Sequence, residues 1–268
     1  MSGENVERAA TRRSLPDDRL KFVPAGETQP ARCSGLDVSG SLKFESAGKP
    51  MRVAFVVCGA LAREVMDIAR RHGWDVSFHG VDAQAHMRPE RIAPLVEGRL
   101  RELIPRFDRV VVVYGDCGTG GALDAVLRRY NVPRIAGPHC YEMYGGASFD
   151  AMMEEEPGTF FLTDFLLRGF TGMVWKGLGL DRFPQLKDAY FANYRRLVYL
   201  AQRSDDTLME RAHAVAQQLG LPLEVRHTGY GALETRLVAL MNDIAGEQYR
   251  PVMEQRLASS ADHKAGKP

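Results

Sequence analysis

The sequence has few cysteines, no excess of charge of either sign and no long apolar run. Four of its 268 residues are cysteine, which is too few for a disulfide scaffold in a chain of this length. Thirty-five Lys and Arg against 34 Asp and Glu leave a formal net charge of +1, so no basic excess draws the chain to nucleic acid or to an anionic membrane. No apolar stretch approaches the roughly 18 residues of a membrane-spanning helix. We therefore expect a small-molecule substrate, no nucleic acid and no membrane partner.

The N-terminal sequence does not read as an export signal. Arg12 and Arg13 form a twin-arginine pair, but the polar segment Leu15–Arg19 follows where such a signal needs an apolar one. We expect a cytoplasmic protein, where thiols normally stay reduced. A homo-oligomer or a protein partner is possible from the sequence, and no internal repeat is visible.

Composition divides the chain into three parts. Residues 1–48 and 247–268 are polar and lack periodicity, which predicts a disordered N-terminal tail and a C-terminal tail. Residues 49–246 alternate short β-branched runs with helical spacing, which predicts one α/β domain. The expected architecture is a doubly wound, mostly parallel sheet of five or six strands, flavodoxin-like or Rossmann-like, with helices on both faces. Strands are predicted at residues 52–57, 75–78, 110–113, 131–136, 159–163 and 223–226, and residues 184–219 are predicted as two helices.

The predicted sheet is organised around residues 110–121, where four consecutive valines lead into a glycine-rich turn. Such a run is typical of a central parallel strand, and ligands bind at the carboxyl edge of these sheets. Cys58, Cys117 and Cys140 each follow a different predicted strand at that edge. In the strand order 2-1-3-4-5 these strands are neighbours, about 5 Å apart per step. We therefore expect the three sulfurs to lie within about 4 to 7 Å of one another.

Three thiolates beside His139 are a suitable ligand set for a metal. A Cys3His zinc site would be closed and structural, whereas three cysteines with an exchangeable fourth position would be open and potentially catalytic. A [4Fe–4S] cluster held by three cysteines fits the same count. The alternatives are thiol redox chemistry and simple packing of small apolar side chains. Cys33, in the predicted tail, is expected to be uninvolved.

Other residues near the same edge are candidates for binding or proton transfer. Glycine lets the backbone approach a ligand, and a glycine-rich turn before a helix can cradle phosphate, although the Walker and Rossmann spacings are missing. General acid or base chemistry needs carboxylates or imidazoles within reach, but helix capping is the simpler role for Asp164. The expected cofactor-binding residues are Gly59, Gly118, Thr119, Gly120 and Gly121, and the candidate acid–base residues are Asp116, Asp164 and His227. Tyr190, Tyr194, Leu197 and Ala201 are expected to form the core stripe of a helix.

Three separated motifs resemble one known family. They are Val56–Glu64 around Cys58, Tyr114–Gly118 around Cys117, and Gly137–Tyr144 around His139 and Cys140. In this order they are similar to the family of unknown function number 1638, found in bacteria and methanogenic archaea, over roughly residues 51 to 245. The resemblance implies that Cys58, Cys117, His139 and Cys140 act as a set, and it implies no reaction.

The sequence thus predicts a protein that binds zinc or an iron–sulfur cluster, with Cys58, Cys117, His139 and Cys140 as metal ligands. We expect it to be an enzyme acting on a small molecule at this centre. The alternatives are a non-catalytic carrier of a metal or cofactor, and a phosphate-binding or nucleotide-binding protein that uses the glycine-rich loop.

Overall fold

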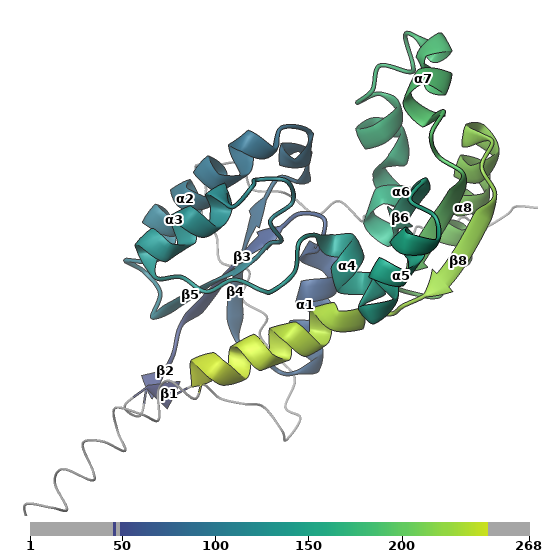
Figure 1. Ribbon diagram of the computed structural model, residues 1–268. Helices are drawn as coiled ribbons and strands as arrows, with labels where there is room; N and C mark the ends of the chain where they lie inside the picture. The colour runs from purple at the N-terminus through teal and green to yellow at the C-terminus, as the bar shows by residue number, and fades with distance from the viewer. Residues whose placement is uncertain (1–44, 47–48, 246–268) are drawn as a thin grey trace, which may run out of the picture.

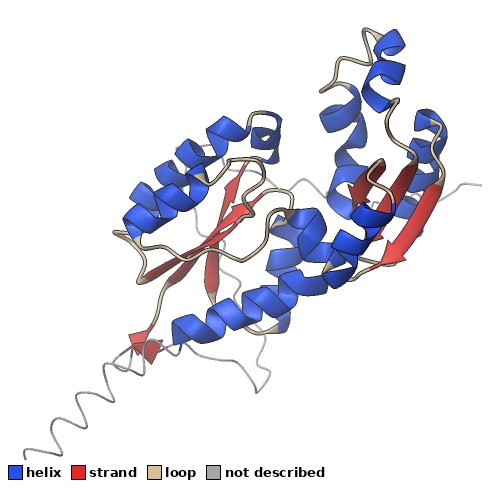
Figure 2. Ribbon diagram, in the orientation of Figure 1, coloured by secondary structure: helices blue, strands red, loops and turns tan. Residues whose placement is uncertain are grey.

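Six parallel strands form two separate sheets of three strands each. The computed structural model describes residues 45–46 and 49–245, and Figures 1 and 2 show the two sheets with helices around each of them. In the first sheet the order is β4-β3-β5, from Val76–Val81, Val53–Cys58 and Arg109–Val113; in the second it is β6-β7-β8, from Thr159–Thr163, Arg196–Ala201 and Leu223–His227. The predicted α/β class with parallel strands is confirmed, but the single sheet of five or six strands is not.

The helices connect the strands in the expected alternation. They are α1 (Ala62–Arg71), α2 (Ile92–Leu103), α3 (Ala122–Tyr130), α4 (Cys140–Gly145), α5 (Ala147–Glu155), α6 (Asp164–Phe170), α7 (Lys187–Phe191) and α8 (Asp206–Leu219). Shorter turns are the 3-10 segments η1 (Ala83–Met87), η2 (Pro89–Arg91) and η4 (Pro184–Leu186), and the π-helical η3 (Thr171–Trp175). A last helix covers residues 231–245. Around the first sheet, α2 and α3 lie on one side and α1 with this last helix on the other (Figure 1).

The first sheet has the predicted strand order. The central β3 is buried at every position and pairs in parallel with β4 on one side and β5 on the other. The next run, predicted as a strand at residues 131–136, forms only an isolated parallel bridge between Val112 and Arg134. The order second, first, third and fourth is thus kept, although the fourth run is too short to be a strand and the sheet ends there.

The strand β7 corrects one prediction. Leu197 and Ala201 belong to a strand that contains Arg196–Ala201, while Tyr190 is an exposed residue of α7, so these residues form no common helical stripe. Side chains alternate across a strand. Val198 and Leu200 therefore pack into the core of the first sheet, whereas Leu197 and Tyr199 pack into a second core against α6 and α8. A short apolar run fits either a strand or a buried helix, which is why periodicity alone misassigned it.

Both ends of the described chain are associated with the first sheet. β1 (Glu45–Ser46), inside the predicted tail, pairs antiparallel with β2 (Lys49–Pro50). The last helix returns from the second sheet and contributes Leu233, Leu237 and Met241 to the first core. The predicted tails, with Cys33, otherwise lie outside the described residues. Within the described ranges no helix is both long and apolar enough to cross a membrane.

Candidate functional site

The three cysteines lie where the sequence predicts, at the carboxyl edge of the first sheet. Cys58 is the last residue of β3 and is buried, Cys117 lies in the loop after β5, and Cys140 is the first residue of α4. Cys117 and Cys140 are half-buried, and all three are free thiols. Cys117 has a positive φ of 48°, a conformation that side chains other than glycine rarely adopt and that clusters at functional sites.

The loops that carry Cys117 and Cys140 are tied together through their backbones. The N–H of Cys117 donates to the carbonyl oxygen of Pro138 at 2.8 Å. A Cβ at Gly115 would lie only 2.7 Å from that same oxygen and 2.9 Å from the Cα of His139. Glycine at position 115 therefore allows the two loops to approach, and this contact brings Cys117 toward the segment that contains Cys140.

The three thiols lie close enough to influence one another. Burial raises the pKa of Cys58 from 9.0 to about 12 and that of Cys117 to about 11, and the nearby Cys58 and Cys117 add to the effect of burial in raising the pKa of Cys140. Tyr114, directly after β5, is fully buried, and its pKa is raised by burial and by all three cysteines. Even so, among the described residues no three or more His, Cys, Asp or Glu side chains are grouped as ligands of one metal ion. The three thiols are therefore near one another, but they are not arranged as ligands of one metal ion.

The raised pKa values predict slow alkylation of the folded, metal-free protein. Only the thiolate reacts with iodoacetamide, and a thiol pKa of about 11 in place of 9.0 leaves about 100-fold less thiolate at pH 8. Labelling of Cys117 should therefore be about 100-fold slower in the folded protein than in urea, and should rise about tenfold per pH unit toward pH 11. Peptide mapping by mass spectrometry measures both rates. Equal labelling with and without urea at pH 8 would contradict the assigned pKa.

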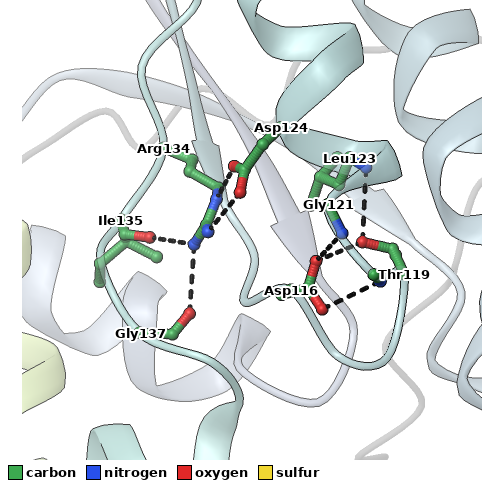
Figure 3. A network of polar contacts seen from close by, with 9 residues as sticks. Asp116, Thr119, Gly121, Leu123, Asp124, Arg134, Ile135 and Gly137 are labelled. Carbon is green, nitrogen blue, oxygen red and sulfur yellow. Dashed lines mark hydrogen bonds and ion pairs between the residues drawn. The ribbon is translucent and has the colours of Figure 1, made fainter.

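Asp116 organises the glycine-rich loop from inside. Its carboxylate accepts hydrogen bonds from the Thr119 hydroxyl at 2.5 Å, from the N–H of Gly121 at 3.0 Å and from the N–H of Gly120 at 3.2 Å (Figure 3). These bonds hold the pKa of Asp116 below its ordinary value. Because this carboxylate already occupies the N–H groups that would bind a phosphate, the geometry argues against the predicted phosphate cradle. Gly118 is exposed, and the N–H of Gly59 donates to Val81.

A second set of contacts in Figure 3 fixes the chain that leads to Cys140. Arg134 forms an ion pair with Asp124 and donates to the carbonyl oxygens of Ile135 and Gly137. The guanidinium also lies near Cys117 and lowers the pKa of its thiol, against the larger effects of burial and of the Asp116 carboxylate, which both raise it. Arg134 is therefore a cation that favours the thiolate form of Cys117 without contacting it through a hydrogen bond.

His139 caps a helix in this structure. Its Nδ1 accepts a hydrogen bond from the N–H of Glu142 at 3.3 Å, and its ring packs edge-on against Tyr141 and Phe149. These contacts use one of the two ring nitrogens and aim the ring along the start of α4. The predicted role of His139 as a metal ligand thus stays a prediction, and it requires this cap to open, because Nε2 of the neutral ring carries the proton while Nδ1 accepts.

His86 is a neighbour of the site that sequence reasoning missed. It lies on η1, just after β4, and its Nε2 is 3.9 Å from Sγ of Cys58. Its ring stacks on Tyr114, with 5.5 Å between the ring centres. The prediction ended the second strand at Phe78, whereas β4 continues to Val81. With the true strand end, the rule that selected the cysteines would also have selected the turn that carries His86.

Asp164 is a buried structural residue of the second sheet. It was expected to cap α6 at the surface, but Thr163 is the cap, and Asp164 is fully buried as the first helical residue. Its Oδ1 accepts from the Tyr199 hydroxyl at 2.7 Å and from the N–H of Gln202 at 3.0 Å. Its Oδ2 lies 3.6 Å from Arg168. The simple capping role is therefore wrong, because the carboxylate holds the carboxyl ends of β6 and β7 together instead.

Two buried polar side chains, Glu64 and Tyr144, lie near Asp164. Glu64, in the first turn of α1, is only 2% exposed, and burial raises its pKa, with Asp164 adding to the effect. Tyr144 of α4 is also buried, and its pKa is raised by burial, by Glu64, Cys140 and Cys58, and by Asp164. Asp164, Glu64 and Tyr144 thus form a buried polar layer, and Tyr144 is its member nearest to Cys140 and Cys58. His227 lies apart from this layer, exposed at the end of the edge strand β8.

Two hollows mark the surface away from the thiols. One, of about 670 Å³, is lined by residues of β5, α3 and the last helix, including Asp124 and Arg134. The other, of about 720 Å³, lies between α2 and α3. No cysteine lines either hollow.

Comparison with known proteins gives a family but no activity. No curated protein matches the chain. Among solved structures, an ornithine carbamoyltransferase from Pyrococcus furiosus is 14% identical, with a TM-score of 0.23; the match covers 67% of this chain and 57% of that one, a likeness too low to carry an argument. Residues 81–237, more than half of the chain and including Cys117, His139 and Cys140, match the family described as "Protein of unknown function (DUF1638)". The chain therefore belongs to the DUF1638 family.

Proposed function

We propose that Cys58, Cys117 and Cys140 bind a metal ion or an iron–sulfur cluster. The observation that carries this proposal is the arrangement of three thiols, each following a different segment at one sheet edge, near enough to shift one another's pKa. Thiolates are the soft ligands that zinc and iron–sulfur clusters prefer. The buried Tyr114 hydroxyl lies beside them, close enough to Cys58 for each group to shift the pKa of the other.

Binding requires the thiols to close in and to lose their protons. No three-ligand group is formed among the described residues, and burial keeps the thiols protonated. A cation favours the thiolate, so a metal would reverse the effect of burial and release protons as it binds. The nearby Arg134 supports the loss of the proton from Cys117, because its guanidinium favours the anion.

At such a centre, the bound metal would supply Lewis acidity, and a cluster would supply electron or sulfur transfer to a small molecule. The side chains around the metal would supply the proton transfer. Tyr114 is buried beside the thiols and holds its proton, so it could donate one at the site. A carrier that hands its metal to a partner protein is the second candidate, and the half-buried Cys117 favours it because this residue is partly exposed.

Anaerobic purification followed by elemental analysis and a visible spectrum tests the proposal. We expect bound metal in the full-length protein, with broad visible absorption if the centre is a cluster and none if it is zinc. Cys58→Ser, Cys117→Ser and Cys140→Ser should each lose most of the metal, because a three-thiolate site loses much of its affinity with one ligand. Cys33→Ser is the matched control and should keep it. Equal metal content in all four variants and the unaltered protein would overturn the proposal.

A further inference from the structure

His86 and Cys58 come together because their strands are neighbours. β4 pairs with β3 so that Val81 is the partner of Cys58, and η1 begins two residues after Val81. The turn is fixed at its start, where the Asp82 carboxylate accepts the N–H of Gln84 at 2.9 Å. The half-buried His86 is thus held over the edge at which β3 ends, with its Nε2 3.9 Å from Sγ of Cys58.

The hydrogen bonds of His86 assign its tautomer. Nδ1 lies 2.8 Å from the carbonyl oxygen of Ala83. A carbonyl only accepts, so Nδ1 must carry the proton, and Nε2 in the neutral ring presents its lone pair toward Cys58. A backbone carbonyl bound to one ring nitrogen, with the other free, is the arrangement that orients histidine ligands in metal sites. The stacked Tyr114 ring fixes the plane of the imidazole as well.

The distance between the two atoms suits two ligands of one tetrahedral ion. Zn–S bonds of about 2.3 Å and Zn–N bonds of about 2.0 to 2.1 Å at a tetrahedral angle place sulfur and nitrogen about 3.6 Å apart. The observed 3.9 Å is close to that spacing. His139 is the opposite tautomer: its Nδ1 accepts a hydrogen bond from Glu142, so in the neutral ring Nε2 carries the proton and offers no lone pair to a metal.

We propose that His86 is the fourth ligand, so that Cys58 and His86 form one half of a Cys3His site for a divalent ion such as Zn²⁺, and Cys117 and Cys140 close on it. This inference rests on the proposed function, and it specifies a single divalent ion instead of an iron–sulfur cluster. A site closed by His86 has no open coordination position. A small molecule would therefore reach the metal only by displacing the imidazole, and the residue that controls access would be His86.

Titration of the metal-free, full-length protein with Co²⁺ and with Zn²⁺ tests the assignment. Co²⁺ bound to thiolates absorbs visible light, which reports both affinity and coordination. We expect His86→Ala to weaken binding about 100-fold or more, since even substitutions outside the ligand set weaken metal sites by about 10-fold to 100-fold. His86→Cys should restore binding to within about tenfold, because a thiolate replaces the imidazole. His213→Ala, at an exposed histidine of α8, is the control and should bind as the unaltered protein does.

The outcomes separate this inference from the proposed function. If the three Cys→Ser variants lose Co²⁺ while His86→Ala binds like the unaltered protein, the fourth ligand is not His86, and the metal site itself stands. If the unaltered protein binds no Co²⁺ or Zn²⁺ through its cysteines, both ideas fail. Circular dichroism checks folding. If His86→Ala does not fold, the Co²⁺ spectrum of His86→Cys decides, because only a direct ligand changes from nitrogen to sulfur coordination.

Discussion

Replacing Gly231 with Ala should lower the free energy of unfolding by about 3 to 5 kcal/mol, a loss that single substitutions cause only when they disrupt packing or strain the backbone severely. Gly231 begins the last helix with φ of +50°, and an added Cβ would lie 2.2 Å from the carbonyl oxygen of Tyr144 and 2.9 Å from that of Met143. Neither backbone atom can yield without moving α4. The measurement is the free energy of unfolding in urea, followed by circular dichroism.

Gly229→Ala is the matched control for this substitution. Gly229 has nearly the same φ, +55°, but nothing lies within 4 Å of the position that a Cβ would take there. Both variants carry the strain of a left-handed alanine, about 1 to 2 kcal/mol, so the difference between them isolates the collision with α4. Equal losses of stability in the two variants would contradict the close approach of residue 231 to Tyr144.

Replacing Asp164 with Ala should also cost about 3 to 5 kcal/mol, because it removes one member of a buried ion pair. The Tyr199 hydroxyl and the N–H of Gln202 would lose their acceptor, and Arg168 would lose its anion. Buried donors without acceptors are themselves costly. Since each kcal/mol lowers the melting temperature of a protein this large by about 2 to 4 °C, the expected decrease is roughly 10 °C.

Asp181→Ala serves as the control for Asp164, because Asp181 is an exposed aspartate. Its loss should change stability by no more than about 0.5 kcal/mol. Asp164→Asn adds a second comparison, since the amide keeps an acceptor for Tyr199 and Gln202 and removes only the charge. A melting temperature of Asp164→Ala within about 2 °C of that of the unaltered protein would show that the buried contacts are not made in solution.

The local features of the fold could be predicted from the sequence, because they depend on neighbouring residues. The bounds of β6, for example, follow from an apolar run that ends at Thr163. The position of the three cysteines at the carboxyl edge of the first sheet could be predicted because the β-branched runs before Cys58 and Tyr114 end clearly in the sequence. Asp164 was misread because its sequence position fits a helix cap, and only the tertiary structure buries it.

Strand pairing could not be predicted in the same way. The run at residues 131–136 is interrupted by Pro133, which has no N–H to donate to a neighbouring strand, and only Val112 and Arg134 form a bridge. The first sheet therefore stops, and β6 starts a second sheet instead of extending the first. His86 was overlooked for a related reason, since the polar Ser77 and His79 within β4 hid where the strand ends.

The alternation of side chains along β7 has a consequence for how the molecule unfolds. Val198 and Leu200 on one face and Leu197 and Tyr199 on the other belong to different cores but to one six-residue strand. If β7 unfolds, both cores lose side chains that pack in them, so neither core can unfold around β7 without disrupting the other. The two halves are therefore thermodynamically coupled, and denaturation should be a single cooperative event in which amide hydrogen exchange of β3 and β7 reports the same opening free energy.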